Sequence, residues 1–354
     1  MSSKVLITRR TLLRQSAALL AASALATPVR AARRGPVTVG AGEHTYEVQH
    51  DWARLPDSHA FGNTHGVGVD RNGFVHVKHT VHSSSQSGDA ICVFDADGKF
   101  VRSWGAEFRG GAHGLTLVRE PREDFLYLAD CNRGVVRKTT LGGETVLEFA
   151  WPEASGLYET REQYRPTNVA VVPHDLMHDG KPHPAAGHIY VADGYGKSWI
   201  HQYDARGGYL RSFGGVGAER GQTSCPHGIA FDRRTGHPRL IVADRSNRRI
   251  QYFTLEGRHN GFVKDELRSP CHFDQRGGLL LVPDLEARVT LLDRDDKLVA
   301  HLGDGENFGL RDKPRAEFIA GKFIAPHSAC FDADGNIFVV EWVEVGRVTR
   351  LRRV

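Results

Sequence analysis

One strand pattern recurs six times along the chain, and it constrains the fold more than any other feature. Each copy is a short run of apolar residues that ends in an acidic or polar residue. Such runs between Gly-rich turns are typical of β-strands. Repetition of a unit of this size indicates a repeat architecture, in which one domain spans the whole array. The six copies are 74–79, 125–130, 188–193, 239–244, 279–284 and 336–341.

The residues around each copy predict a four-stranded antiparallel unit. A second strand follows, such as 90–95 or 198–204, and then a turn with an Asp-Gly or Gly-Gly pair. These pairs supply the positive φ angles that hairpin turns need. A third strand comes after the turn, as in 100–105 and 209–214, and a fourth precedes each copy. Four such strands build a propeller blade, so we predict an all-β, six-bladed β-propeller.

The last unit lacks its outer strand, because the chain ends shortly after residues 347–352. The strand-like stretch 44–50 has no other assignment. We predict that this N-terminal strand completes the last blade and closes the ring, which would remove an open sheet edge. The propeller is therefore expected at 43–354, with a linker at 32–42.

The first residues indicate an export signal at 1–31. A basic segment with paired arginines, 8–14, precedes an apolar run, 16–26, that is too short to span a bilayer comfortably. The arginine pair resembles a twin-arginine signal, and an ordinary secretory signal is the alternative. We expect a periplasmic or extracellular protein without stable membrane insertion. The net charge of +4 is inflated by this segment, so it does not indicate a nucleic-acid partner, and none is expected.

The cysteines do not form a recognisable framework. Their odd number and wide spacing predict mostly buried thiols, with one disulfide as an alternative, and the absence of a CxxC pair excludes a thiolate zinc knuckle. They are Cys92, Cys131, Cys225, Cys271 and Cys330.

Histidine recurs at one register of the repeat, where the chain enters the strand before each copy. In a propeller this entry lies near the central channel, so equivalent positions form a ring, and the even-numbered units place His113, His227 and His327 around the axis. Three imidazoles with an open position suit catalytic zinc or another transition metal. The alternative is that the Pro-His-Gly sequence only builds a turn. The six aligned positions, here called the histidine column, are His65, His113, Thr167, His227, Ser269 and His327.

Four further side chains are candidates for the chemistry. His65 is a candidate fourth ligand, outer-sphere partner or substrate contact, and His79, at the end of the first copy, is a second candidate substrate contact. Arg245 follows its strand directly and is suited to bind a carboxylate, with a surface ion pair as the alternative. Tyr195 is a candidate general base if a metal or arginine lowers its pKa, with a structural tyrosine as the alternative.

These motifs resemble NHL-repeat six-bladed propellers, and among them the peptidylglycine α-hydroxyglycine α-amidating lyase family. The resemblance covers about residues 60–354. It implies zinc on His113, His227 and His327, a catalytic Tyr195 and an active-site Arg245. The motifs that carry it are 165–171, 191–195, 226–228, 242–251 and 326–327.

Two positions depart from that family. Thr80 stands where the family has a second active-site arginine, and Ser328 stands where it has a calcium-binding aspartate. The resemblance therefore implies zinc, or another divalent transition metal, but does not support calcium.

We expect lyase-like chemistry on a small polar or peptide-derived molecule in the central channel, of the zinc-dependent carbon–nitrogen lyase (peptidylamidoglycolate lyase-like) type. Two alternatives stay open. One is a non-catalytic periplasmic binding or scaffold propeller, in which the histidines are turn residues. The other is a lactonase-type hydrolase, which is less favoured because that family's calcium site uses acidic and amide side chains.

Overall fold

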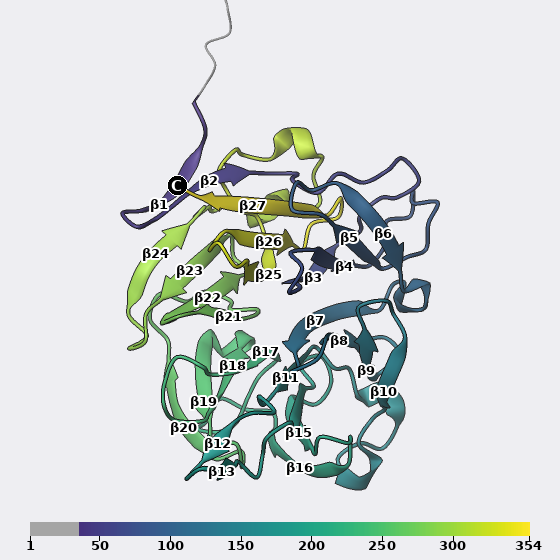
Figure 1. Ribbon diagram of the computed structural model, residues 1–354, viewed down its shortest axis with the longest axis vertical. Coiled ribbons are helices and arrows are strands. Elements are labelled where there is room, and N and C mark those ends of the chain that lie inside the picture. The colour runs from purple at the N-terminus through teal and green to yellow at the C-terminus, as the bar shows by residue number, and fades with distance from the viewer. Residues whose placement is uncertain (1–34) are drawn as a thin grey trace, which may run out of the picture. The chain divides into compact units, whose positions relative to one another are not determined.

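Six antiparallel sheets surround a central axis in the computed structural model, which describes residues 35–354 (Figure 1). The predicted export signal at 1–31 and the first residues of the predicted linker lie outside the described residues. In the described part of the chain, no helix is long and apolar enough to cross a membrane. Short 3-10 helices are η1 (Ala106–Phe108), η2 (Glu153–Ser155), η3 (Arg161–Gln163), η4 (Arg245–Asn247), η5 (Phe308–Leu310) and η6 (Arg315–Glu317).

Each sheet is one blade, and the blades follow one another in chain order, so the predicted six-bladed propeller is confirmed. The first strand of each blade is innermost and the last is outermost. Blade 1 contains β3 (Thr64–Val69), β4 (Val75–His79), β5 (Ile91–Phe94) and β6 (Phe100–Trp104). Blade 2 contains β7 (Ala112–Arg119), β8 (Asp124–Asp130), β9 (Val135–Thr140) and β10 (Thr145–Phe149). Blade 3 contains β11 (Asn168–Val171), β14 (Ile189–Ala192), β15 (Trp199–Tyr203) and β16 (Tyr209–Gly214), with a small hairpin of β12 (Met177–His178) and β13 (Lys181–Pro182).

The second half of the ring repeats this arrangement. Blade 4 contains β17 (Pro226–Phe231), β18 (Leu240–Asp244), β19 (Arg249–Phe253) and β20 (His259–Val263). Blade 5 contains β21 (Asp274–Arg276), β22 (Leu279–Asp284), β23 (Arg288–Leu292) and β24 (Leu298–Leu302). Blade 6 contains β25 (Pro326–Phe331), β26 (Ile337–Glu341) and β27 (Arg347–Arg353).

The N-terminal closure is confirmed. Strand β2 (His44–Gln49) pairs antiparallel with β27 and supplies the outer strand of blade 6. Tyr46 on β2 is 2% exposed and packs in the same apolar cluster as Leu302 and Leu351. Four residues of the predicted linker form one more strand, β1 (Thr38–Ala41), which pairs with β2. The positive φ of Gly42 makes the tight turn between β1 and β2 possible. The sequence analysis predicted only a linker here.

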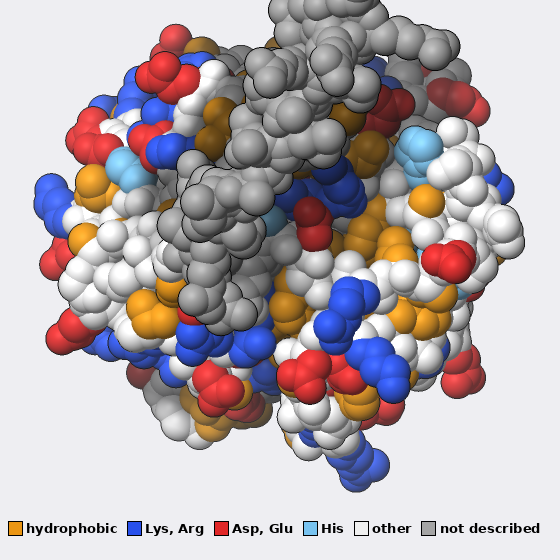
Figure 2. Space-filling view, turned by 90° about the horizontal axis from the view of Figure 1, so that it is seen from above, with side chains coloured by type: hydrophobic (Ala, Val, Ile, Leu, Met, Phe, Trp, Pro, Cys, Tyr) orange, Lys and Arg blue, Asp and Glu red, His pale blue; other side chains and the backbone are white. Residues whose placement is uncertain are grey.

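Apolar clusters between neighbouring blades hold the ring together. The middle strands are buried on both faces, as in β8 and β18, so each blade packs on both of its neighbours. Charged side chains of both signs are interspersed on the surface seen in Figure 2, without a large patch of one sign. The innermost strands β25, β3, β7, β11 and β17 contact one another in that order, and their first residues therefore meet at one end of the channel.

Closure by the N-terminal strands should dominate the stability of blade 6. Deleting residues 36–49 removes the partner of β27, and Tyr46→Ala removes a buried aromatic ring, at a cost of about 3–5 kcal/mol. Both changes should lower the melting temperature, measured by circular dichroism or calorimetry. Val101→Ala is the control, because Val101 is 46% exposed on an outer strand. Unchanged melting in both variants would contradict the role of this closure.

Candidate metal centre

The four histidines of the column converge at one end of the channel. The ring centroids of His113, His227 and His327 lie 4.7–4.9 Å from one another. His65 joins them, with its ring centroid 4.9 Å from that of His113 and 4.5 Å from that of His327. All four side chains are buried. The structure therefore brings together every histidine of the column.

A local irregularity of the innermost strand accompanies each of these histidines. The pairing register of the strand shifts where the histidine sits, as a β-bulge does, and bulges re-aim side chains at the rims of barrels and near active sites. The shifts lie between Thr64 and Gly66, Ala112 and Leu115, Pro226 and Ile229, and Pro326 and Ser328.

The three predicted ligands share one hydrogen bond that fixes their rings. In each, Nδ1 lies within hydrogen-bond distance of a backbone carbonyl of the next blade. A carbonyl only accepts, so Nδ1 carries the proton and Nε2 keeps its lone pair, which is the form that binds a metal. The pairs are His113 with Thr167 O at 2.7 Å, His227 with Cys271 O at 2.8 Å and His327 with His65 O at 2.8 Å.

The glycine that follows two of these histidines permits this contact. A Cβ on Gly114 would lie 2.3 Å from the carbonyl oxygen of Thr167, and one on Gly228 would lie 2.5 Å from that of Cys271. These are the carbonyls that accept the histidine protons. The His-Gly pair is therefore needed because the neighbouring blade passes too close for any side chain.

Two overlapping triads can be drawn in the cluster, and both contain His113 and His327. Ligand atoms of these two and of His65 all lie within 4.8 Å of one another. His65 differs in chemistry, because its Nδ1 faces Nε2 of His327 at 3.3 Å rather than a carbonyl. His227 has the same carbonyl-fixed ring as the other two, so we favour His113, His227 and His327 as the ligand set, with His65 beside it.

Burial keeps these histidines neutral. Loss of hydration lowers the pKa of all four well below 6.5, and positive or titratable neighbours lower it further. Neutral imidazole is the state in which histidine binds a metal. The buried histidine cluster is thus arranged to hold a metal ion.

Tyr195 lies in contact with the cluster. Its hydroxyl is 3.1 Å from Nε2 of both His113 and His227, so it bridges the two rings. Burial raises the pKa of Tyr195 to about 12, and the positive charge of Arg245 opposes that rise. The phenol therefore lies within hydrogen-bond distance of two of the predicted ligands.

Arg245 reaches the same place and has no carboxylate partner among the described residues. Its Cζ lies 5.4 Å from the centre of the Tyr195 ring. Its guanidinium contacts the thiols of Cys225 at 3.2 Å and Cys271 at 3.9 Å. These geometries disfavour the alternative of a surface ion pair, and they leave the guanidinium available to an anionic ligand. All five cysteines are free thiols.

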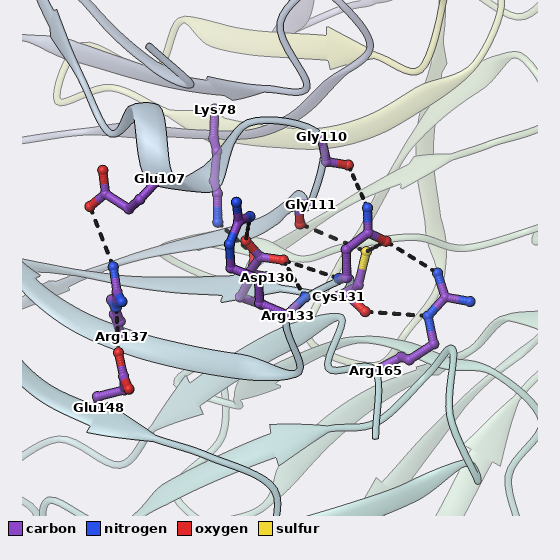
Figure 3. Close-up of polar contacts among 12 residues, drawn as sticks. Lys78, Glu107, Gly110, Gly111, Asp130, Cys131, Arg133, Arg137, Glu148 and Arg165 are labelled. Carbon is purple, nitrogen blue, oxygen red and sulfur yellow. Dashed lines mark hydrogen bonds and ion pairs between the residues drawn. The ribbon is translucent and has the colours of Figure 1, made fainter. Parts of the chain in front are cut away.

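Lys78 is a residue near the centre that the sequence reading did not single out (Figure 3). It is buried, and burial lowers its pKa to about 7. Its ammonium donates to the carbonyls of Ala129 at 2.6 Å and Gly114 at 3.3 Å, so it ties blade 1 to the residue after His113. In the sequence, Lys78 is distinguished only by its position in the repeat, which the other units fill with alanine, proline or valine.

The acid that ends the second strand copy, Asp130, has a structural role. Figure 3 shows Asp130, whose carboxylate accepts the backbone N–H groups of Asn132 and Arg133 and pairs with the Arg133 side chain at 2.8 Å. On the same loop, Cys131 accepts a hydrogen bond from Arg165 through its carbonyl at 3.3 Å. This loop therefore has a fixed conformation beside the channel.

His79 does not join the cluster. Its Nδ1 accepts backbone N–H groups from Gly62 and Val81, and its Nε2 lies 3.5 Å from Sγ of Cys92. The ring also packs edge-on against Phe61. Both nitrogens are used inside blade 1, so the geometry gives no support to the predicted substrate contact.

Comparison with known proteins agrees with the repeat motifs. No family model matches the chain. Peptidyl-glycine alpha-amidating monooxygenase A of Xenopus laevis is 31% identical over 203 residues, which are 55% of this chain and only 19% of that protein. Human NHL repeat-containing protein 3 is 26% identical over 68% of this chain and 67% of its own length. A probable peptidyl-alpha-hydroxyglycine alpha-amidating lyase of Caenorhabditis elegans is 22% identical over 74% of this chain and 69% of its own.

Solved structures share the fold. A virginiamycin B lyase from Staphylococcus aureus has a TM-score of 0.54 at 13% identity, over 87% of this chain and 100% of that one. A streptogramin B lyase has a TM-score of 0.55 at 12% identity, over 87% and 97%. The chain is thus a six-bladed β-propeller that resembles NHL-repeat proteins, and the amidating enzymes among its sequence relatives support, at low identity, a lyase-like propeller.

The His-Gly contact predicts a mutational effect on metal binding. Gly228→Ala should push the Cys271 carbonyl away and misplace the His227 ring, so metal affinity should fall about 10–100-fold, as for other outer-sphere changes. Metal titration with a competing chelator measures this. Gly236→Ala is the matched control, because nothing lies within 4 Å of a Cβ there. Equal affinity in both variants would contradict the role of the carbonyl.

His79 predicts an acid-dependent loss of stability. Burial lowers its pKa to about 3 in the folded chain, so at pH 5 only the unfolded chain binds this proton. The contribution of neutral His79 to the free energy of unfolding is therefore full above the pKa of about 6.5 in the unfolded chain. It falls by about 2 kcal/mol at pH 5. Urea unfolding of His79→Gln should show a smaller difference between pH 7 and pH 5 than the parent protein. An unchanged difference would exclude His79 as a source of acid sensitivity.

Proposed function

We propose that the chain is an exported, metal-dependent carbon–nitrogen lyase that acts on a peptidyl-α-hydroxyglycine or a related small molecule bound in the central channel. The observation that carries the proposal is the set of three neutral imidazoles with fixed Nδ1 protons, next to Tyr195 and Arg245. His113, His227 and His327 would hold zinc or another divalent transition metal. Three nitrogen ligands leave a coordination position open for substrate.

The bound metal would supply Lewis-acid polarisation of the substrate hydroxyl or carboxylate. Arg245 would hold the substrate carboxylate through paired N–H donors. A bound metal beside Arg245 would add the positive charge needed to lower the pKa of Tyr195, and its phenolate form would then take the proton of the α-hydroxyl group. The hydroxyl oxygen then forms a carbonyl, the C–N bond breaks, and Tyr195 returns the proton to the leaving nitrogen. The products are an amide and glyoxylate, with no net change in protons or oxidation state.

We also propose that the chain is exported. The predicted twin-arginine-like signal at 1–31 would carry the chain to the periplasm or outside the cell, with the propeller as the mature protein. The partner we propose is a small or peptide-derived ligand, without nucleic acid and without lasting membrane insertion.

A second candidate is a non-catalytic binding propeller. One observation favours it: Thr80 stands where the lyase family has its second active-site arginine. In that case the cluster would bind a ligand without breaking it.

Metal analysis separates the two candidates from a purely structural histidine cluster. Tag-free protein reconstituted with zinc should hold one ion, and a His113→Ala, His227→Ala double variant should lose it, measured by mass spectrometry of the metal. His65→Ala should keep most of it. Less than stoichiometric metal in the parent protein would contradict the proposed metal site.

Activity then separates lyase from binding propeller. Glyoxylate release from a peptidyl-α-hydroxyglycine should fall about 10²–10⁴-fold in Tyr195→Phe if the phenol is the general base, with metal content unchanged. Tyr209→Phe is the control, because its hydroxyl bonds only Ser212 among the described residues. Arg245→Gln should raise KM more than it lowers kcat. Metal-loaded protein that releases no glyoxylate would contradict the lyase assignment.

A further inference from the structure

A cavity opens at the other end of the channel from the histidines. Its volume is about 310 Å³, and its lining comes mainly from the innermost strands of blades 1, 2, 5 and 6 and the residues next to them, with Arg233 from the turn after β17 of blade 4. The far end of the cavity lies away from the histidines, because His113 is near the start of β7 and Arg119 ends it, about 20 Å apart at 3.3 Å per residue. The near wall includes Val67 and Leu115, each two residues after a column histidine, and His272. We call this cavity the distal pocket.

Three arginines from separate blades line the distal pocket: Arg119 of blade 2, Arg233 of blade 4 and Arg276 of blade 5. None of them forms an ion pair within the part of the chain that the structure describes. One nitrogen of Arg119 donates to the Val69 carbonyl at 3.3 Å, and one of Arg276 donates to the Ala333 carbonyl at 3.1 Å. Each guanidinium has five N–H donors, so most of them remain available.

The two aspartates of the pocket accept backbone hydrogen bonds. Burial raises the pKa of Asp274, and the positive charges of Arg233 and Arg119 oppose that rise. Asp274 accepts the backbone N–H of Phe331 at 2.7 Å. Asp332 accepts the backbone N–H groups of Asp334 and Asn336 in its own turn. Their hydrogen bonds stabilise the strands, and three positive charges face the pocket against these two.

The remaining walls suit a carbon chain. The lining includes the apolar side chains of Val67, Leu115 and Phe273. In the same lining, Nδ1 of His272 is buried without a hydrogen-bond partner. A buried polar atom of this kind costs free energy unless a ligand or water satisfies it. The pocket therefore offers charged, polar and apolar contacts together.

We propose that the distal pocket binds a small organic dianion, such as a dicarboxylate, independently of the metal centre. Arginine binds carboxylates through paired N–H groups. Arginines on separate blades can hold two carboxylates, while the apolar wall packs against the carbons between them. The volume is at the lower end of the range for small-molecule sites, which fits a compact dianion rather than a peptide.

Calorimetric titration of the full-length, metal-loaded protein with succinate tests this proposal. We expect saturable binding that weakens as ionic strength rises. Arg119→Gln and Arg233→Gln should each weaken it about tenfold, since each removes a charged hydrogen-bond donor. Arg211→Gln is the charge-matched control, because Arg211 is exposed on β16, outside the pocket.

Arg245→Gln separates the two ends of the channel. The substitution removes the arginine beside the histidines, which could itself bind a carboxylate, so saturable succinate binding that persists in this variant belongs to the distal pocket. Loss of binding in Arg245→Gln, retention of full affinity in both pocket variants, or the absence of saturable binding in the parent protein would each overturn the proposal. Circular dichroism of every variant confirms that the comparison is made between folded proteins.

Discussion

The hydrogen bond from a column histidine to the carbonyl of the next blade is the interaction on which the site depends. It sets the tautomer of the ring, aims Nε2 at the axis and links the inner strands of two blades. It also explains the glycines after His113 and His227, because the carbonyl must approach the backbone closely. A propeller built from similar units gives each even-numbered blade the same geometry, so one local solution yields three matched ligands.

The charges along the channel complement this arrangement. The histidine end is kept neutral by burial, which disfavours protonation and favours metal binding. Arg245, beside it, has only thiols and the Tyr195 ring as neighbours. A guanidinium without a carboxylate partner costs free energy at a partly buried site. Its presence there is understandable if an anion occupies the site during function.

Much of the fold follows from the sequence, because each blade repeats one strand pattern and an outer strand is missing at one end of the chain. The residues of the site were less predictable. The column placed His113, His227 and His327 correctly near the axis, since strand starts meet there. His79 is also a histidine and ends a strand copy, but both of its ring nitrogens make contacts within blade 1 instead of reaching the cluster. Lys78 was not predicted, because its departure from the alanine, proline or valine of the other units does not by itself show that the side chain is buried beside the histidines.

The sequence by itself determined the six units, their closure and the ring of histidines, since these depend on local pattern and chain order. Tertiary structure decided which side chains meet. The carbonyls that fix the three rings lie 54, 44 and 262 residues away in the chain. The register shifts that accompany the histidines arise from pairing between strands. Both depend on the packing of separate segments at sub-ångström precision, and no local pattern of residue types encodes distances of that kind.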